Sequence, residues 1–288
     1  MTVTNSTAAG GVELETLFYE AVADGVVLIT LNRPERGNGV VPELVRDFLA
    51  ALDGLEPDFS IRALVLTGAG RQFCAGADLV EMHRYLEQRL RVEQEPYNAR
   101  VLHPLTQRLV VSRLPIVAAI NGGATAGGLD MALACDLRLA SERAKLGETY
   151  VSLGLAPGNG GSWFLPRLIG TGLAAELALT GDLIDAQRAL EIGLVNRVLA
   201  PEDLLPEAIA LAAKIAARPR RAIEATKQAL RTAWQTDLVG ALSASFWATT
   251  ALQYTDDVSE GVAAALEKRS PRYNVPPGET GDTDKERT

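Results

Sequence analysis

Apolar and polar residues follow two different patterns along the chain. Up to about Ala200, short apolar runs typical of buried strands alternate with stretches whose apolar residues recur at helical spacing. Strands are predicted at Val26–Leu31, Ile61–Thr67, Pro115–Ile120, Leu137–Ala140 and Val195–Ala200. Helices are predicted between them at Pro42–Leu55, Arg100–Val111, Gly128–Cys135, Gly160–Ile169 and Leu173–Thr180. Strands separated by helices favour an α/β architecture.

After Pro201 the pattern is helical only. Helices are predicted at Glu202–Ala217, Pro219–Trp234, Leu238–Tyr254 and Asp256–Lys268, with Pro or Gly near their junctions. We expect the apolar and aromatic side chains of these helices to be buried, either against the core or against a second subunit. We therefore expect an α/β core at residues 12–200 and a helical region at 201–273. Residues 1–11 and 274–288 are polar or rich in Gly and Pro, and we expect them to be disordered tails.

Two glycine-rich stretches, Phe73–Leu79 and Asn121–Asp130, are the main candidates for chemistry. Each follows a predicted strand and leads into a helical segment. The first N–H groups of a helix have no partner within it and can hold an anion. Two such donors that meet at one point form an oxyanion hole. Glycine can also serve a tight turn alone, but two such loops, with the Asp130 carboxylate after the second, favour the chemical interpretation.

Composition and charge narrow the possible functions. The net charge of −8 makes nucleic acid and anionic membrane surfaces unexpected partners. Two cysteines make no disulfide framework and suit a reducing compartment. Residues 1–11 lack the features of a secretory signal, and no apolar run is long enough for a membrane span, so we expect a cytoplasmic protein. The two histidines, His83 and His103, lack metal-ligand spacing, so no metal site is expected.

A series of motifs in order along the chain resembles the crotonase, or enoyl-CoA hydratase/isomerase, superfamily. The likeness runs from about Leu14 to Asn274. The motifs are Leu31-Asn32-Arg33-Pro34, Cys74–Leu79, Pro115–Gly122, Ala134-Cys135-Asp136, Pro157-Gly158, Gly160-Gly161, Leu165-Pro166-Arg167 and Glu260-Gly261. Each motif alone is weak, whereas the ordered series over nearly the whole chain is specific.

The resemblance implies a crotonase-like spiral of ββα turns, followed by a C-terminal helical region. Through this region the chains would assemble into a homotrimer, or into a hexamer of two trimers. It implies an acyl-CoA thioester as substrate, no separate cofactor and an enolate intermediate. The family's two oxyanion donors fall on the backbone N–H groups of Ala75 and Gly127. Ala77, Asp78, Leu79 and Trp163 are expected to bind substrate, although Asp78 can also cap a helix and Trp163 can also be core.

The chain departs from the family's pattern at the catalytic positions. The hydratases use two glutamates, whereas here Asp130 and Tyr150 occupy those positions and Ala126 replaces a glycine. Glu148 precedes Tyr150 by two residues. In an extended segment the two side chains would point to the same side, roughly 6.5–7 Å apart. Glu148 could then supply a second acid/base group or pair with a nearby cation, and Tyr150 could orient a proton or form a pocket wall.

Several functions remain open from these residues. Isomerisation of a double bond needs one proton carrier, which fits Asp130 alone, whereas hydration needs a held water, which fits Asp130 with Glu148. Hydrolysis of a C–C bond or decarboxylation could use the same enolate. The alternative outside catalysis is an acyl-CoA-binding trimer that has lost its glutamates.

Overall fold

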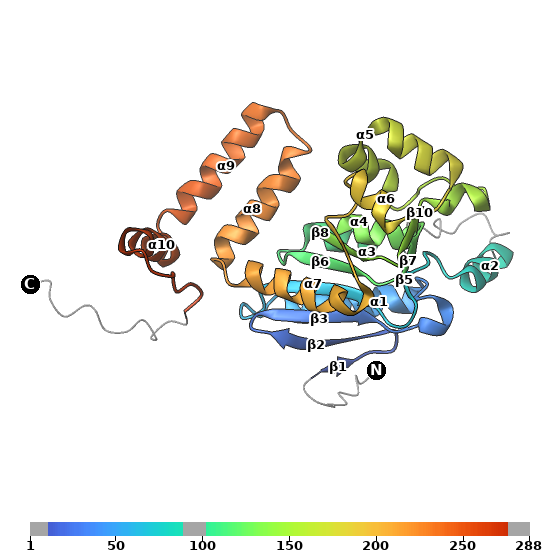
Figure 1. Ribbon diagram of the computed structural model, residues 1–288, viewed down its shortest axis with the longest axis horizontal. Helices are drawn as coiled ribbons and strands as arrows, with labels where there is room; N and C mark the ends of the chain where they lie inside the picture. Colours follow the sequence, from blue (N-terminus) through green and yellow to red (C-terminus); the bar gives the residue numbers. More distant parts are fainter. Residues whose placement is uncertain (1–10, 89–101, 276–288) are drawn as a thin grey trace, which may run out of the picture. The chain divides into compact units, whose positions relative to one another are not determined.

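The structure is a computed structural model that describes residues 11–88 and 102–275 (Figure 1). The chain forms two compact units, the first ending at Ala213 and the second beginning at Lys214. Most of helix α7 (Pro201–Ala216) therefore belongs to the first unit rather than to the helical region expected from residue 201. Among the described helices, none is both long and apolar enough to cross a membrane.

A seven-stranded sheet forms the centre of the first unit. Its strands, in spatial order, are β1 (Val12–Glu13), β2 (Leu17–Ala23), β3 (Val26–Leu31), β4 (Ala63–Gly68), β6 (Ile116–Ile120), β8 (Leu137–Ser141) and β11 (Arg197–Leu199). The first three strands pair antiparallel, and the pairs from β3 to β11 are parallel. Every residue of β3, β4 and β6 is buried, as continuous apolar runs predict for a sheet covered on both faces.

Helices alternate with these strands along the chain. They are α1 (Pro42–Leu55), α2 (Leu79–Gln88), α3 (His103–Val111), α4 (Gly127–Ala134), α5 (Gly161–Thr180) and α6 (Ala186–Glu191), together with the 3₁₀ turns η1 (Pro34–Arg36) and η3 (Thr149–Leu153). Helix α1 buries Leu44, Phe48 and Leu52 on one face, the spacing of an amphipathic helix. All residues of α4 are buried, so this helix is part of the core.

A second sheet of four short strands lies beside the first (Figure 1). Its order is β10 (Ile184–Asp185), β9 (Lys145–Gly147), β7 (Gly123–Thr125) and β5 (Gln72–Cys74), none of which is predicted from the sequence. Strands β5, β7 and β9 are parallel, so their carboxyl ends lie at one edge of the sheet. Along the chain, β4 precedes β5, β6 precedes β7 and β8 precedes β9, and each pair leads into helical structure. The chain therefore makes successive ββα turns.

The second unit contains α8 (Arg220–Ala233), α9 (Leu238–Leu252) and α10 (Asp256–Glu267). Helix α9 carries no charged side chain, yet none of its residues is buried. Asn274, expected in a disordered tail, is instead anchored: its side-chain amide donates to the Arg218 carbonyl (2.9 Å) and accepts from the Arg220 N–H (3.0 Å). The rest of the two predicted tails lies almost entirely outside the described residues, as do the first residues of the helix predicted from Arg100.

Candidate active site

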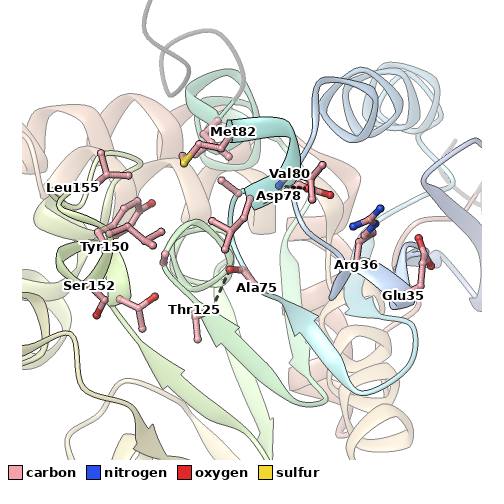
Figure 2. Close-up of a pocket in the computed structure, with 16 residues that line it drawn as sticks. Glu35, Arg36, Ala75, Asp78, Val80, Met82, Thr125, Tyr150, Ser152 and Leu155 are labelled. Carbon is pink, nitrogen blue, oxygen red and sulfur yellow. Dashed lines mark hydrogen bonds between the residues drawn. The ribbon is translucent and has the colours of Figure 1, made fainter. Parts of the chain in front are cut away.

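A cavity of about 540 Å³ opens at the edge where β5, β7 and β9 end (Figure 2). Its lining comes from the segments that follow these strands, with further residues from η1, α2 and the start of α3. The lining residues are Glu35, Arg36, Ala75, Ala77, Asp78, Leu79, Val80, Met82, Leu102, Thr125, Ala126, Thr149, Tyr150, Ser152, Leu153 and Leu155. Because β5, β7 and β9 end at the same edge, both glycine-rich stretches and the segment after β9 lie beside this cavity.

The two glycine-rich loops are in direct contact. A Cβ on Gly128 would overlap the Cys74 carbonyl oxygen, and one on Gly76 would lie 3.1 Å from the Gly127 nitrogen. Figure 2 shows the hydrogen bond that joins the loops, in which the Thr125 hydroxyl donates to the Ala75 carbonyl (3.1 Å). Glycine is needed at these positions because the two backbones pass too close for a side chain.

One of the two backbone N–H groups expected to hold an oxyanion is already hydrogen-bonded within the protein. The N–H of Gly127 is the first of α4, and it has no acceptor among the described residues. The N–H of Ala75, in contrast, donates to the Gly37 carbonyl (2.9 Å). The expectation that the Ala75 N–H is free for an oxyanion is therefore wrong. In the same loop the Ala77 N–H has no acceptor in the described part of the chain, and Ala77 lines the cavity.

The structure brings together the three residues predicted to be catalytic. The Tyr150 hydroxyl donates to Asp130 Oδ2 (2.5 Å). Asp130 and Glu148 are fully buried, and neither Asp130 Oδ1 nor either Glu148 oxygen has a hydrogen-bond partner among the described residues. A Cβ on Gly161, the first residue of α5, would lie 2.5 Å from Glu148 Oε1 and 2.7 Å from Asp130 Oδ1. The two carboxyl groups therefore lie side by side against the start of α5.

Burial controls the charge of this group. It raises the pKa of Asp130 to about 7, although the hydrogen bond from Tyr150 acts in the opposite direction. Burial raises the pKa of Glu148 further, to about 9, and repulsion from Asp130 adds to the effect. Burial, followed by the charge of Asp130, also raises the pKa of the Tyr150 phenol. Near neutral pH, Tyr150 therefore holds its proton, and the two neighbouring carboxyl groups titrate together with pKa values raised above their ordinary range.

The local backbone around Glu148 differs from the expectation. Glu148 precedes the 3₁₀ turn η3 with φ −90° and ψ 67°, so Glu148 and Tyr150 do not belong to one extended segment. The two side chains both reach Asp130 because the chain turns between them. The expectation that Glu148 and Tyr150 point to the same side of an extended segment is therefore wrong, although both residues lie close to Asp130.

The four residues expected to bind substrate divide into two groups. Ala77, Asp78 and Leu79 line the cavity, and their role in binding stays a prediction. Asp78 also caps α2, since its carboxylate accepts from the Val80 and Glu81 N–H groups and pairs with Arg33 (2.9 Å). Contrary to the expectation, Trp163 is not among the lining residues. Its ring packs edge-on against Phe164, with the Arg167 guanidinium 4.4 Å from its centre.

Asn38 is a positioning residue that the sequence interpretation missed. It is fully buried with φ 54°, and its amide donates to the carbonyls of Ala69 (3.0 Å) and Gln72 (2.8 Å). These bonds fix the approach to β5 and hence the first glycine-rich loop. The sequence Gly37-Asn38-Gly39 carries the available signal, because Asn flanked by Gly is typical of a left-handed turn.

Two other kinds of chemistry are absent from the described residues. Burial raises the pKa of the Cys74 thiol to about 12, so this cysteine is a packed side chain rather than a nucleophile. Within residues 11–88 and 102–275, no group of three or more His, Cys, Asp or Glu side chains is placed to hold a metal ion. Proton transfer by Asp130 and its neighbours is the chemistry that these side chains offer.

Comparison with known proteins agrees with the fold and the motifs. The model of the enoyl-CoA hydratase/isomerase family matches residues 21–276. YngF of Bacillus subtilis, whose name places it among the enoyl-CoA hydratases/isomerases, is 40% identical over 262 residues, which cover 90% of this chain and 98% of YngF. The crotonyl-CoA hydratase of Syntrophomonas wolfei is 35% identical over 250 residues, covering 86% and 94% of the two chains.

A solved structure shows the same architecture. The enoyl-CoA hydratase from Bacillus anthracis superposes with a TM-score of 0.82 at 36% identity, covering 90% of this chain and 99% of that one. The protein therefore has the crotonase fold and is an enzyme that acts on acyl-CoA thioesters. It belongs to the enoyl-CoA hydratase/isomerase family.

Proposed function

We propose that the cavity binds an enoyl-CoA thioester and that the backbone N–H groups of Gly127 and Ala77 hold its enolate oxygen. The observation that carries this proposal is the contact between the two glycine-rich loops, each of which offers one N–H without an acceptor among the described residues. Negative charge builds on the thioester oxygen when a proton leaves the neighbouring carbon. One donor of such a pair is typically worth about 3–4 kcal/mol of barrier.

The proton chemistry favours double-bond isomerisation as the reaction. Burial raises the pKa of Asp130 to about 7, so this carboxyl group can take up and give back a proton near neutral pH, and one proton carrier is sufficient to move a proton between two carbons. Hydration is the second candidate. It is favoured by the position of Glu148 beside Asp130, where a protonated carboxyl group could hold a water, and by the names of several relatives.

A single assay separates these reactions. Conjugated enoyl thioesters absorb in the ultraviolet, so hydration of crotonyl-CoA lowers the absorbance, whereas conversion of a 3-enoyl-CoA to the conjugated 2-enoyl-CoA raises it. Glu148→Gln should lower hydration at least about tenfold if Glu148 holds the water, and should change isomerisation little. A protein that binds acyl-CoA in calorimetry but transforms neither substrate would favour the non-catalytic alternative. Release of a shortened acyl chain or of CO₂ would favour C–C cleavage.

We also propose that the chain assembles as a homotrimer, or as a hexamer of two trimers, through its second unit. Helix α9 carries a largely apolar surface, and its exposed side chains include Leu238, Val239, Leu242, Phe246 and Trp247. An apolar surface of this kind is typical of a subunit interface. Light scattering at micromolar concentration should give at least three times the 30.7 kDa chain mass. A monomeric mass would contradict the proposal.

A further inference from the structure

The three buried acid/base residues do not have equal access to the cavity. Asp130 and Glu148 have no exposed surface, and neither belongs to the cavity lining. Tyr150 lines the cavity and is drawn among its side chains in Figure 2. A molecule in the cavity therefore meets Tyr150 before it meets either carboxyl group.

The Tyr150 hydroxyl lies close to the first turn of α4, which carries both Gly127 and Asp130. Its oxygen would be 3.6 Å from a Cβ on Gly127, whose N–H is a proposed oxyanion donor. The hydroxyl also donates to Asp130 Oδ2 at 2.5 Å. Within the described residues, Tyr150 is thus the residue that lines the cavity and also donates a side-chain hydrogen bond to Asp130.

We propose that Tyr150 is the catalytic residue that takes the proton from the substrate carbon, and that Asp130 is a positioning residue that receives the phenolic proton behind it. This inference rests on the proposed function. As the C–H bond next to the thioester breaks, its proton forms a new O–H bond with the Tyr150 oxygen. The original phenolic proton moves to Asp130 Oδ2 at the same time, and the electron pair of the C–H bond enters the enolate.

The same path in reverse completes an isomerisation. Tyr150 gives a proton to the far carbon of the enolate, and Asp130 returns its proton to the Tyr150 oxygen. Both residues end in their starting states, so no other reactant is needed. Because burial and the Asp130 charge raise the pKa of Tyr150, a free phenolate would be costly, and the two transfers must therefore occur together.

Deuterium exchange isolates the proposed step from hydration. A saturated substrate such as butyryl-CoA cannot add water, yet its C2 hydrogens exchange with D₂O if the enzyme forms the enolate. Tyr150→Phe keeps the ring and removes the hydroxyl, and we expect it to lower C2 exchange by at least about 100-fold, the range of general acid–base catalysis. Binding of butyryl-CoA in calorimetry should change little.

Tyr19→Phe is the matched control. Tyr19 is half-buried on β2 and lies outside the cavity lining, so this variant should exchange the C2 hydrogens as the wild type does.

The outcomes separate this inference from the proposed function. Exchange at the wild-type rate in Tyr150→Phe would show that Tyr150 does not take the proton and would overturn the inference alone. No exchange in the wild type, together with no isomerisation of a 3-enoyl-CoA, would instead overturn the proposed enolate chemistry.

Isotope effects on the wild type give a second test that does not depend on folding of a variant. Two protons moving together predict a solvent isotope effect that persists when the substrate carries deuterium at C2. Direct transfer to Asp130 predicts no solvent isotope effect on proton abstraction, and that result would also overturn the inference.

Discussion

The two sheets of the first unit differ in length, burial and purpose. The longest strands belong to the seven-stranded sheet: β2 contains seven residues, and β3 and β4 contain six each. The strands of the four-stranded sheet contain only two or three residues. The large sheet carries the buried apolar runs, whereas β5, β7 and β9 end at the cavity. Each ββ turn therefore uses its first strand for stability and its second to place a functional segment.

The largest expected effect tests how tightly the short sheet is assembled. Gly128→Ala would place a methyl group on the Cys74 carbonyl, a backbone atom of β5 that cannot move without separating the loops. We expect a loss of about 3 kcal/mol or more in the free energy of unfolding, the upper part of the range for overpacking. Urea unfolding followed by circular dichroism measures it.

The matched control lies in a helix that covers the large sheet. Gly54 is in α1, and a Cβ there would meet nothing within 4 Å. Gly54→Ala should therefore be neutral or stabilising by about 0.5–1 kcal/mol. Equal effects of the two substitutions would contradict the difference drawn between the sheets.

The long and short strands also differ in how well the sequence predicts them. Val26–Leu31 and the helix Pro42–Leu55 have the predicted bounds, because a continuous apolar run and a helical period are local signals. Strand β5, with residues Gln72–Cys74, is too short to show a period and is held by its neighbours. The sequence predicted α/β architecture and the approach of the two loops, but it could not show which N–H groups remain free.

The same limit applies to the catalytic group. The resemblance identifies Asp130 and Tyr150, at the positions of the family's two glutamates, and the spacing to Tyr150 adds Glu148. Their division into one residue at the cavity and two behind it depends on the turn after β9, which has no sequence signal of its own. Trp163 was misplaced for a related reason, since an aromatic residue near a glycine turn fits a core position as well as a pocket wall.

The next largest effect concerns catalysis at the short sheet. Asp130→Asn keeps the shape of the side chain but cannot accept a proton, so turnover should fall by about 10²–10⁴. Binding of an acyl-CoA should change little, because the backbone donors remain. Steady-state kinetics and calorimetry on one preparation measure both. Full activity in this variant would show that Asp130 takes no proton in the reaction, whether directly or through Tyr150.

A smaller effect should appear in the pH dependence of stability. The pKa values of Asp130 and Glu148 are raised by burial, so the folded state binds more protons than the unfolded state between their ordinary values near 4 and their folded values of about 7 and 9. Stability from these groups is therefore present at low pH and is lost as the pH rises through that window. The groups that face them are the Tyr150 phenol and, beside it, the Cys74 thiol.

Glu148→Gln removes one of these titrations. Its urea midpoint should fall less between pH 5 and pH 9 than that of the wild type. Glu176→Gln is the control, because Glu176 is exposed on α5, the helix whose first residue meets both carboxyl groups. The variant should keep the wild-type pH dependence. A steeper fall for Glu148→Gln than for the wild type would mean that Glu148 is charged in the folded protein.

The smallest expected effect tests backbone strain beside the cavity. Ala126 has φ 48° and ψ −122°, a conformation that is nearly exclusive to glycine and costs a side chain about 1–3 kcal/mol. Ala126→Gly should relieve this strain, offset by about 0.5–1 kcal/mol of glycine entropy, and so raise the free energy of unfolding by about 1 kcal/mol. Thermal unfolding measures the change, and a lower midpoint would show that packing of the Ala126 methyl group stabilises the fold by more than the strain destabilises it.

In the described part of the first unit, Asn38 and Ala126 are the non-glycine residues with positive φ, and both hold segments of the glycine-rich loops. Neither residue lies in the large sheet, so in this part of the chain the strained non-glycine backbone lies beside the two glycine-rich loops.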